Sequence, residues 1–148
     1  MSIGHLLPAR MILISFLPLP LIFSTMLVGV YITASHQGFS CPGWPLCPNG
    51  LQFPIPKYFF ENLHRLMVLI TFIAIIAVTI HSVIKVNKAR KTSIAASSII
   101  SVQIILGILI INTKLNPLVV AAHLSIGVLL FGMMLITFLS YYNLEKCA

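Results

Sequence analysis

Four long apolar stretches constrain the fold of this chain more than any other feature of its sequence. They occupy residues 11–33, 57–83, 92–111 and 118–142, and each has the roughly 17–25 residues that a helix needs to cross a bilayer. Only α-helices and closed β-barrels satisfy their backbone groups in lipid, and these stretches are too long and too continuously apolar for barrel strands. The sequence therefore predicts an all-α integral membrane protein, a single four-helix bundle domain over residues 1–148.

The composition agrees with a membrane protein and argues against a nucleic-acid partner, despite a formal net charge of +7. Soluble domains carry about 25% charged residues. This chain carries 7% and is 59% hydrophobic. Four of its nine cations fall in the short link between the second and third stretches: Lys85, Lys88, Arg90 and Lys91. Cytoplasmic loops are enriched in Lys and Arg, so we interpret this cluster as a topology signal and expect membrane lipid around the helices.

This signal sets the predicted orientation of the bundle in the cell membrane. With the basic link in the cytoplasm, four crossings place both the N- and the C-terminus there too. The links at residues 34–56 and 112–117 then lie outside. We expect a multi-pass protein of the cell membrane whose first outer loop, with Cys41 and Cys47, is extracytoplasmic.

Prolines mark where the predicted helices bend and begin. Pro18 and Pro20 fall inside the first apolar stretch and predict a kink or a delayed start of its regular part. Gly29, later in the same stretch, offers a small position for close helix contact. Asn116 and Pro117 predict a tight turn, with Pro117 at the first position of the last helix.

Two histidines occupy matching depths on the second and fourth helices, which run in the same direction. His64 follows Lys57, the first residue after the outer-loop prolines, by seven residues, and His123 follows Pro117 by six. At 1.5 Å per residue, both imidazoles lie about 9–10 Å below the outer ends of their helices. Two imidazoles at one depth in a small bundle are candidate axial ligands of a haem iron. The simpler interpretation is two buried histidines in ordinary helix contacts.

Glu61 and Arg65 flank His64 on the same helix. Glu61 is three residues before His64 and four before Arg65, so these side chains share a face. One interpretation is an ion pair that neutralises both charges, and the other is a proton-handling carboxylate beside the iron or substrate. The two roles are compatible. The planar guanidinium of Arg65 also suits a haem propionate.

Cys41 and Cys47 are six residues apart in the proline-rich outer loop. An oxidising compartment permits a disulfide between them. Such a bond would either stiffen the loop over the helix ends or take a redox part near the substrate.

Three segments carry a resemblance to a known family. The loop GFSCPGWPLC, the helix segment ENLHR and the later run ILGILIINTKLNPLVVAAHLSIG together resemble heme A synthase, an integral membrane oxidoreductase. The loop motif matches Cys41 and Cys47, the Glu-x-x-His-Arg motif matches residues 61–65, and the histidine of the last helix matches His123. The resemblance implies that His64 and His123 bind haem, that Glu61 assists the chemistry, and that the two loop cysteines form an extracytoplasmic disulfide.

The resemblance also implies a reaction and its participants. Heme A synthase oxidises the C8 methyl of haem O to the formyl of haem A for terminal oxidases. Haem b as cofactor, haem O as substrate and haem A as product are therefore expected, with contact to a haem O synthase or a terminal oxidase as a further possibility. The usual enzyme has eight helices in two four-helix halves, so our hypothesis for this chain is a homo-oligomer of a half-size enzyme.

Two other classes of membrane protein compete with this interpretation. A non-catalytic haem b electron carrier or oxidase accessory subunit needs the same two histidines but no haem O chemistry. A quinone-linked thiol oxidase needs closely spaced reactive cysteines, commonly Cys-x-x-Cys, with a second pair as relay. A single pair at wider spacing, Cys41 and Cys47, argues against the latter.

Overall fold

The computed structural model of the chain describes residues 6–38 and 59–146, which are α-helical apart from short turns. The helices are α1 (Leu6–Phe16), α2 (Pro18–Ala34), α3 (Phe59–Lys85), α4 (Asn87–Asn112) and α5 (Pro117–Lys146). They provide four segments long and apolar enough to cross a membrane: Met11–Ala34, Phe59–Lys85, Asn87–Asn112 and Pro117–Leu144. The predicted all-α fold is confirmed. The cytoplasmic position of both termini stays a prediction.

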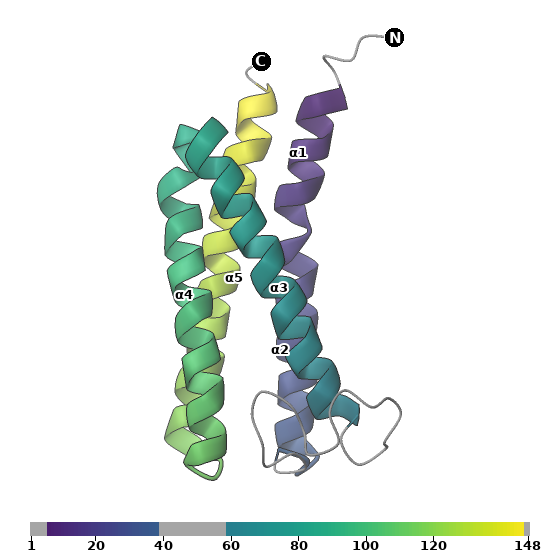
Figure 1. Cartoon of the computed structure of the whole chain (residues 1–148), viewed down its shortest axis with the longest axis vertical. Helices are drawn as coiled ribbons and strands as arrows, with labels where there is room; N and C mark the ends of the chain where they lie inside the picture. Colours follow the sequence, from purple (N-terminus) through teal and green to yellow (C-terminus); the bar gives the residue numbers. More distant parts are fainter. Residues whose placement is uncertain (1–5, 39–58, 147–148) are drawn as a thin grey trace.

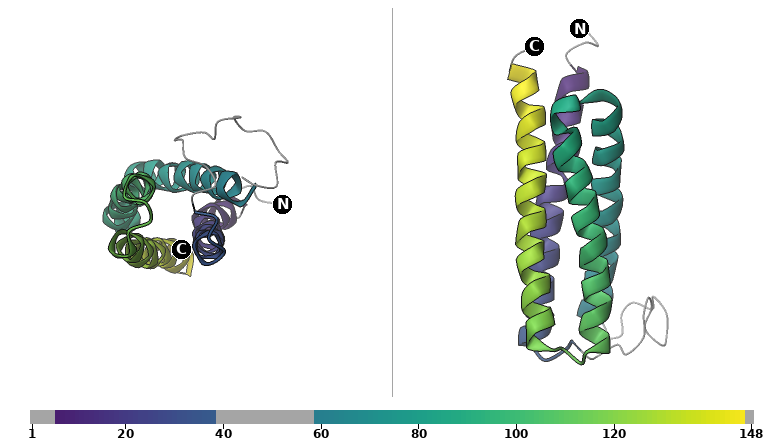
Figure 2. Two further views of the ribbon diagram at one scale, coloured as in Figure 1. Left: turned by 90° about the horizontal axis from the view of Figure 1, so that it is seen from below. Right: turned by 90° about the vertical axis from the view of Figure 1, so that its left-hand side faces the viewer.

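The helices form an antiparallel four-membered bundle (Figures 1 and 2). The α1–α2 segment packs beside α3 and α5, and α4 packs between α3 and α5, with its most extensive contact against α5. Helices α3 and α5 therefore stand on a diagonal, and no backbone approach within 8 Å joins them in the described residues. A side chain that links these two helices must cross the bundle interior.

The first crossing is interrupted at Leu17, between α1 and α2, as the prolines predict. The N–H of Leu17 still donates to the carbonyl of Leu13 at 3.0 Å. Pro18 has no N–H and takes the first position of α2, and Pro20 removes a second helical donor. The two prolines thus explain why one membrane crossing is built from two helices.

The basic residues between α3 and α4 lie on helices rather than in a link, which corrects one sequence-based assignment. Lys85 ends α3, and only Val86 separates it from α4, so Lys88, Arg90 and Lys91 belong to the first turns of α4. We expected that helix to begin near residue 92. Lys and Arg are good helix formers, and Ala89 between them is fully buried, so local propensity and packing both extend the helix.

The turn between α4 and α5 has the predicted form. Pro117 is the first residue of α5. The side-chain oxygen of Asn116 accepts a hydrogen bond from the N–H of Leu118 at 2.9 Å, which satisfies one of the free donors at the helix start. Lys114 and Leu115 complete the turn with positive φ angles of 53° and 60°.

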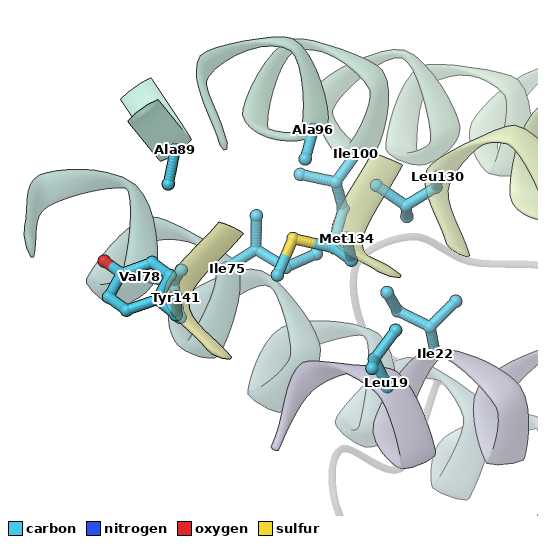
Figure 3. Close-up of a cluster of buried hydrophobic side chains, with 10 residues drawn as sticks. All are labelled: Leu19, Ile22, Ile75, Val78, Ala89, Ala96, Ile100, Leu130, Met134 and Tyr141. Atoms are coloured by element: carbon cyan, nitrogen blue, oxygen red, sulfur yellow. The ribbon is translucent and has the colours of Figure 1, made fainter. Parts of the chain in front are cut away.

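The tightly packed apolar core occupies one half of the bundle, towards the first residue of α1 and the last of α5 (Figure 3). We call this the core half. Its cluster comprises Leu19, Ile22, Ile75, Val78, Ala89, Ala96, Ile100, Leu130, Met134 and Tyr141. The opposite end, which holds the end of α2, the start of α3, the end of α4 and the start of α5, we call the histidine half because His64 and His123 lie there.

Hydroxyl groups link neighbouring helices within the core half. Thr79 and Ser97 are joined at 2.6 Å, and Thr137 donates to Thr92 at 2.9 Å. Interhelical hydrogen bonds of this kind add to packing where no water is present. Together with the apolar cluster, they fix how the four helices sit against one another.

His81 of α3 also lies in the core half, and its side chain is partly buried. Its Nδ1 is 2.8 Å from the hydroxyl of Tyr141, so this contact spans the α3–α5 diagonal. The same hydroxyl is 2.9 Å from Oγ of Ser82, which donates its own hydrogen to the carbonyl of Val78. A single hydroxyl hydrogen on Ser82 makes Tyr141 the donor to Ser82 and the acceptor from His81.

Candidate functional site

Two imidazoles from diagonal helices face the interior of the histidine half. His64 is five residues into α3 and His123 six residues into α5, and both helices begin at the same end of the bundle (Figure 1). Each histidine therefore lies within the first two turns of its helix, at the same end of the bundle.

A glycine on a neighbouring helix lies beside each ring. A methyl group built on Gly29 of α2 would stand 3.0 Å from Cε1 of His64, which is closer than side chains normally approach. A methyl group on Gly107 of α4 would stand 3.9 Å from Cε1 of His123. The ring of His64 is therefore packed closely against α2, and a methyl group at position 29 would force it to shift.

Each of the two imidazole rings has a nitrogen that is available to a ligand. Nδ1 of His64 and Nδ1 of His123 are buried and have no hydrogen-bond partner. Buried polar groups are nearly always hydrogen-bonded. Two ring nitrogens without a partner in one bundle interior therefore indicate a binding site for a ligand. The described residues contain no cluster of three or more His, Cys, Asp or Glu side chains that would hold a bare metal ion. Two imidazoles do fit a haem iron, because the porphyrin supplies the other four ligands.

Glu61 and Arg65 form the ion pair expected from their spacing. The Arg65 guanidinium donates to Oε1 of Glu61 at 2.8 Å, and the side chains are only 16% and 8% exposed. Both sit within one turn of His64 on α3. The pair therefore places a carboxylate and a guanidinium beside the histidine site, and their opposite charges cancel.

Gln103 is a polar site residue that the sequence analysis missed. It lies on α4, and its Nε2 donates to the backbone carbonyl of His123 at 2.9 Å. Its Oε1 is buried without a partner. The signal was a lone amide in an otherwise apolar membrane-crossing stretch, and polar groups at such depth mark functional positions.

Cys41 and Cys47 lie outside the residues that the structure describes. Their predicted disulfide and its position over the helix ends stay predictions.

Known proteins of one family resemble this chain over most of its length. The family "COX15-CtaA: Cytochrome oxidase assembly protein" matches residues 50–147, a segment that includes His64, Gln103 and His123. A "Heme A synthase" from Lysinibacillus sphaericus (strain C3-41) is 35% identical, over 76% of this chain and 39% of that protein. A "Heme A synthase" from Oceanobacillus iheyensis (strain HTE831) is 29% identical, over 82% of this chain and 40% of that protein.

The matched segment is short relative to these proteins. The chain spans about two fifths of the length of both relatives. The family match nevertheless covers well over half of the chain and all the described residues of the histidine site from Phe59 onward. This chain is therefore a member of the cytochrome oxidase assembly protein family that includes the heme A synthases.

Proposed function

We propose that this chain is a heme A synthase-like membrane oxidoreductase that oxidises the C8 methyl of haem O to the formyl of haem A. The observation that carries the proposal is the pair of buried imidazoles, His64 and His123, each with an open Nδ1, on diagonal helices of one bundle. The names of the relatives support the same reaction. Bound haem would supply the redox chemistry of iron, either as haem b cofactor or in the substrate itself. The change from methyl to formyl formally takes one oxygen atom from water and releases four protons and four electrons, which pass to an electron acceptor outside the chain.

Each residue of the site has a role in this proposal. His64 and His123 would hold the haem iron through their imidazole nitrogens. Arg65 places a cation where an anionic haem propionate can pair with it. Glu61 is the only carboxylate near these histidines in the described part of the chain, so it is our candidate to accept or deliver protons during methyl oxidation.

The test is to purify the chain from cells that make haem O but lack another heme A synthase. A pyridine haemochrome spectrum then reports which haems are present. We expect haem A in the protein or in the membranes, and only when the chain is expressed. Bound haem with no haem A in any fraction would contradict the proposed activity, and complete absence of haem would contradict the site as well.

Replacement of Glu61 separates its two candidate roles. General acid–base groups contribute about 10²–10⁴-fold to rate, so Glu61→Gln should lower haem A formation by at least about a hundredfold with haem still bound. The control is the double variant Glu61→Ala/Arg65→Ala, which removes the ion pair as a unit. Recovery of activity in the double variant would show that Glu61 only neutralises Arg65.

A non-catalytic haem b protein is the second candidate function, and the same ion pair favours it. A carboxylate held by Arg65 at 2.8 Å is already engaged, as it would be in a purely structural role. Under this alternative the purified chain carries haem b with reversible reduction, and haem O supplied to the cells stays unchanged.

We further propose that two four-helix units act together as a homo-oligomer. The relatives are more than twice as long as the part that this chain matches, so they have room for a second such unit. An extracytoplasmic Cys41–Cys47 disulfide and contact with a haem O synthase or terminal oxidase belong to the same proposal. Particle mass in mild detergent is the test, and a fully active monomer would contradict the oligomer.

A further inference from the structure

The Gln103 amide is fixed at the border between the histidine half and the core half. Its Nε2 lies 2.9 Å from the backbone oxygen of His123. A carbonyl oxygen only accepts hydrogen bonds, so the NH₂ group must face it and Oε1 must be turned away. The orientation of the amide is therefore determined by its partner.

Gly127 makes this contact possible. In an α-helix the carbonyl of His123 already accepts the N–H of Gly127, and Gln103 adds a second donor to it. A methyl group on Gly127 would stand 2.9 Å from Nε2 of Gln103 and 3.6 Å from Sδ of Met26. Met26 of α2 and Gln103 of α4 thus meet next to Gly127 of α5, where no side chain intervenes. This places the Gln103 amide in the bundle interior, one helical turn deeper than His123.

Oε1 of Gln103, which points away from the His123 carbonyl, has no hydrogen-bond donor. The atom is buried, and no N–H or O–H of the described residues reaches it. Towards the core half, Ile100 and Leu130 begin the packed apolar cluster on the same two helices, α4 and α5. A buried amide oxygen that receives no hydrogen bond from the protein indicates that a bound ligand supplies the donor.

We propose that Oε1 of Gln103 accepts a hydrogen bond from the hydroxyl group on the long apolar side chain of haem O. This inference rests on the proposed function. Haem O differs from haem b at one ring position, where it carries a hydroxylated isoprenoid chain in place of a vinyl group. A site built to pair a substrate hydroxyl strongly disfavours the analogue that lacks it, because a buried polar group is then left unpaired. Gln103 is thus a residue that determines which haem the site accepts.

The experiment compares two haems on one protein. The purified full-length chain, stripped of haem in detergent, is titrated separately with haem O and haem b, and binding is followed by the haem absorption band. We expect the wild-type chain to prefer haem O. The variant Gln103→Leu should lower haem O affinity about tenfold or more and leave haem b affinity within about twofold, which erases the preference.

Two glycine variants on α5 provide a matched pair. Gly127→Ala keeps Gln103 but drives a methyl group to 2.9 Å from its amide, so it should reproduce the loss of preference. Gly132→Ala adds a methyl group that meets nothing within 4 Å, so it should bind both haems as the wild type does. This pair keeps the test informative if Gln103→Leu does not fold.

The outcomes separate the inference from the proposed function. Equal loss of both haems in Gln103→Leu would mean that Oε1 serves a histidine or the fold, and would overturn the inference. Unchanged haem O binding in Gln103→Leu and Gly127→Ala would overturn it too. A wild-type chain that binds haem b and haem O equally overturns the inference alone, whereas one that binds neither overturns the proposed function.

Discussion

The core half and the histidine half are built from the same helices but satisfy their buried groups in opposite ways. In the core half, apolar side chains close on one another and hydroxyl groups bond across helices, as Thr137 does with Thr92. In the histidine half, three buried polar atoms lack partners: Nδ1 of His64, Nδ1 of His123 and Oε1 of Gln103. Among the described residues of the core half, only Nε2 of His81 is buried without a partner, so the unpaired atoms are concentrated in the histidine half.

This difference indicates where a ligand contributes to the structure. Burial of an unpaired polar group costs about 1–3 kcal/mol, so a native chain rarely keeps three of them in one place. The packed core half can carry that cost because it holds the helices in position. We infer that the core half serves as the scaffold and that the histidine half is completed by its ligand.

The sharpest test of this division is removal of one imidazole. His123→Ala should lower haem affinity by more than about a hundredfold, since changes to groups that merely orient a metal ligand already cost 10–100-fold. The free energy of unfolding of the haem-free protein should not fall, because the change deletes an unpaired polar atom. Haem content per chain and thermal unfolding in detergent measure the two effects. A large loss of stability without haem would place His123 among the structural residues.

Two adjacent leucines on α5 give the complementary test. Leu130 is 4% exposed and belongs to the core cluster, whereas Leu129 is 54% exposed on the outer surface. Loss of a buried leucine side chain typically costs about 2–5 kcal/mol, so Leu130→Ala should destabilise the protein by this amount and Leu129→Ala by little. Denaturant titration measures both. Equal stabilities would show that the core half is not the scaffold.

Much of the fold could be predicted from the sequence because membrane crossings leave few choices. Pro18 broke the first crossing where expected, and Pro117 opened the last helix, since a missing N–H has the same consequence in any tertiary context. The start of α4 was set five residues too late. A run of cations was taken for a link, whereas the buried Ala89 shows that one face of that run packs inside.

The site was predictable only in part. The spacing of Glu61 and Arg65 dictates their ion pair, because residues four apart on a helix are neighbours. The contact between Gln103 and His123 joins two helices, and its existence depends on Gly127 facing α4. The rotation of each helix about its axis comes from packing, so no single-helix pattern indicates such a contact.

A smaller effect is expected at Gly29, which leaves room for the ring of His64 in the histidine half. Gly29→Ala would bring a methyl group to 3.0 Å from Cε1 of His64 and turn its ring away from the preferred rotamer. Such a distortion costs about 0.5–1.5 kcal/mol, so haem affinity should fall by about two- to tenfold. Gly132→Ala is the matched control, with open space around the new methyl group. If both variants bind haem equally well, His64 does not hold the iron in the conformation described.

The smallest expected effect concerns a hydrogen bond of the core half. Thr79 and Ser97 are 2.6 Å apart, and Thr79 also lies 3.0 Å from the carbonyl of Ser93. Interhelical hydrogen bonds in membrane proteins contribute about 0.6 kcal/mol on average, because the separated helices find other partners. A double-mutant cycle of Thr79→Val and Ser97→Ala should therefore give a coupling near this value, with haem binding unchanged in every variant. We attribute the stability of the core half mainly to its apolar cluster. A coupling of several kcal/mol would contradict this, because polar contacts would then be the main source of that stability.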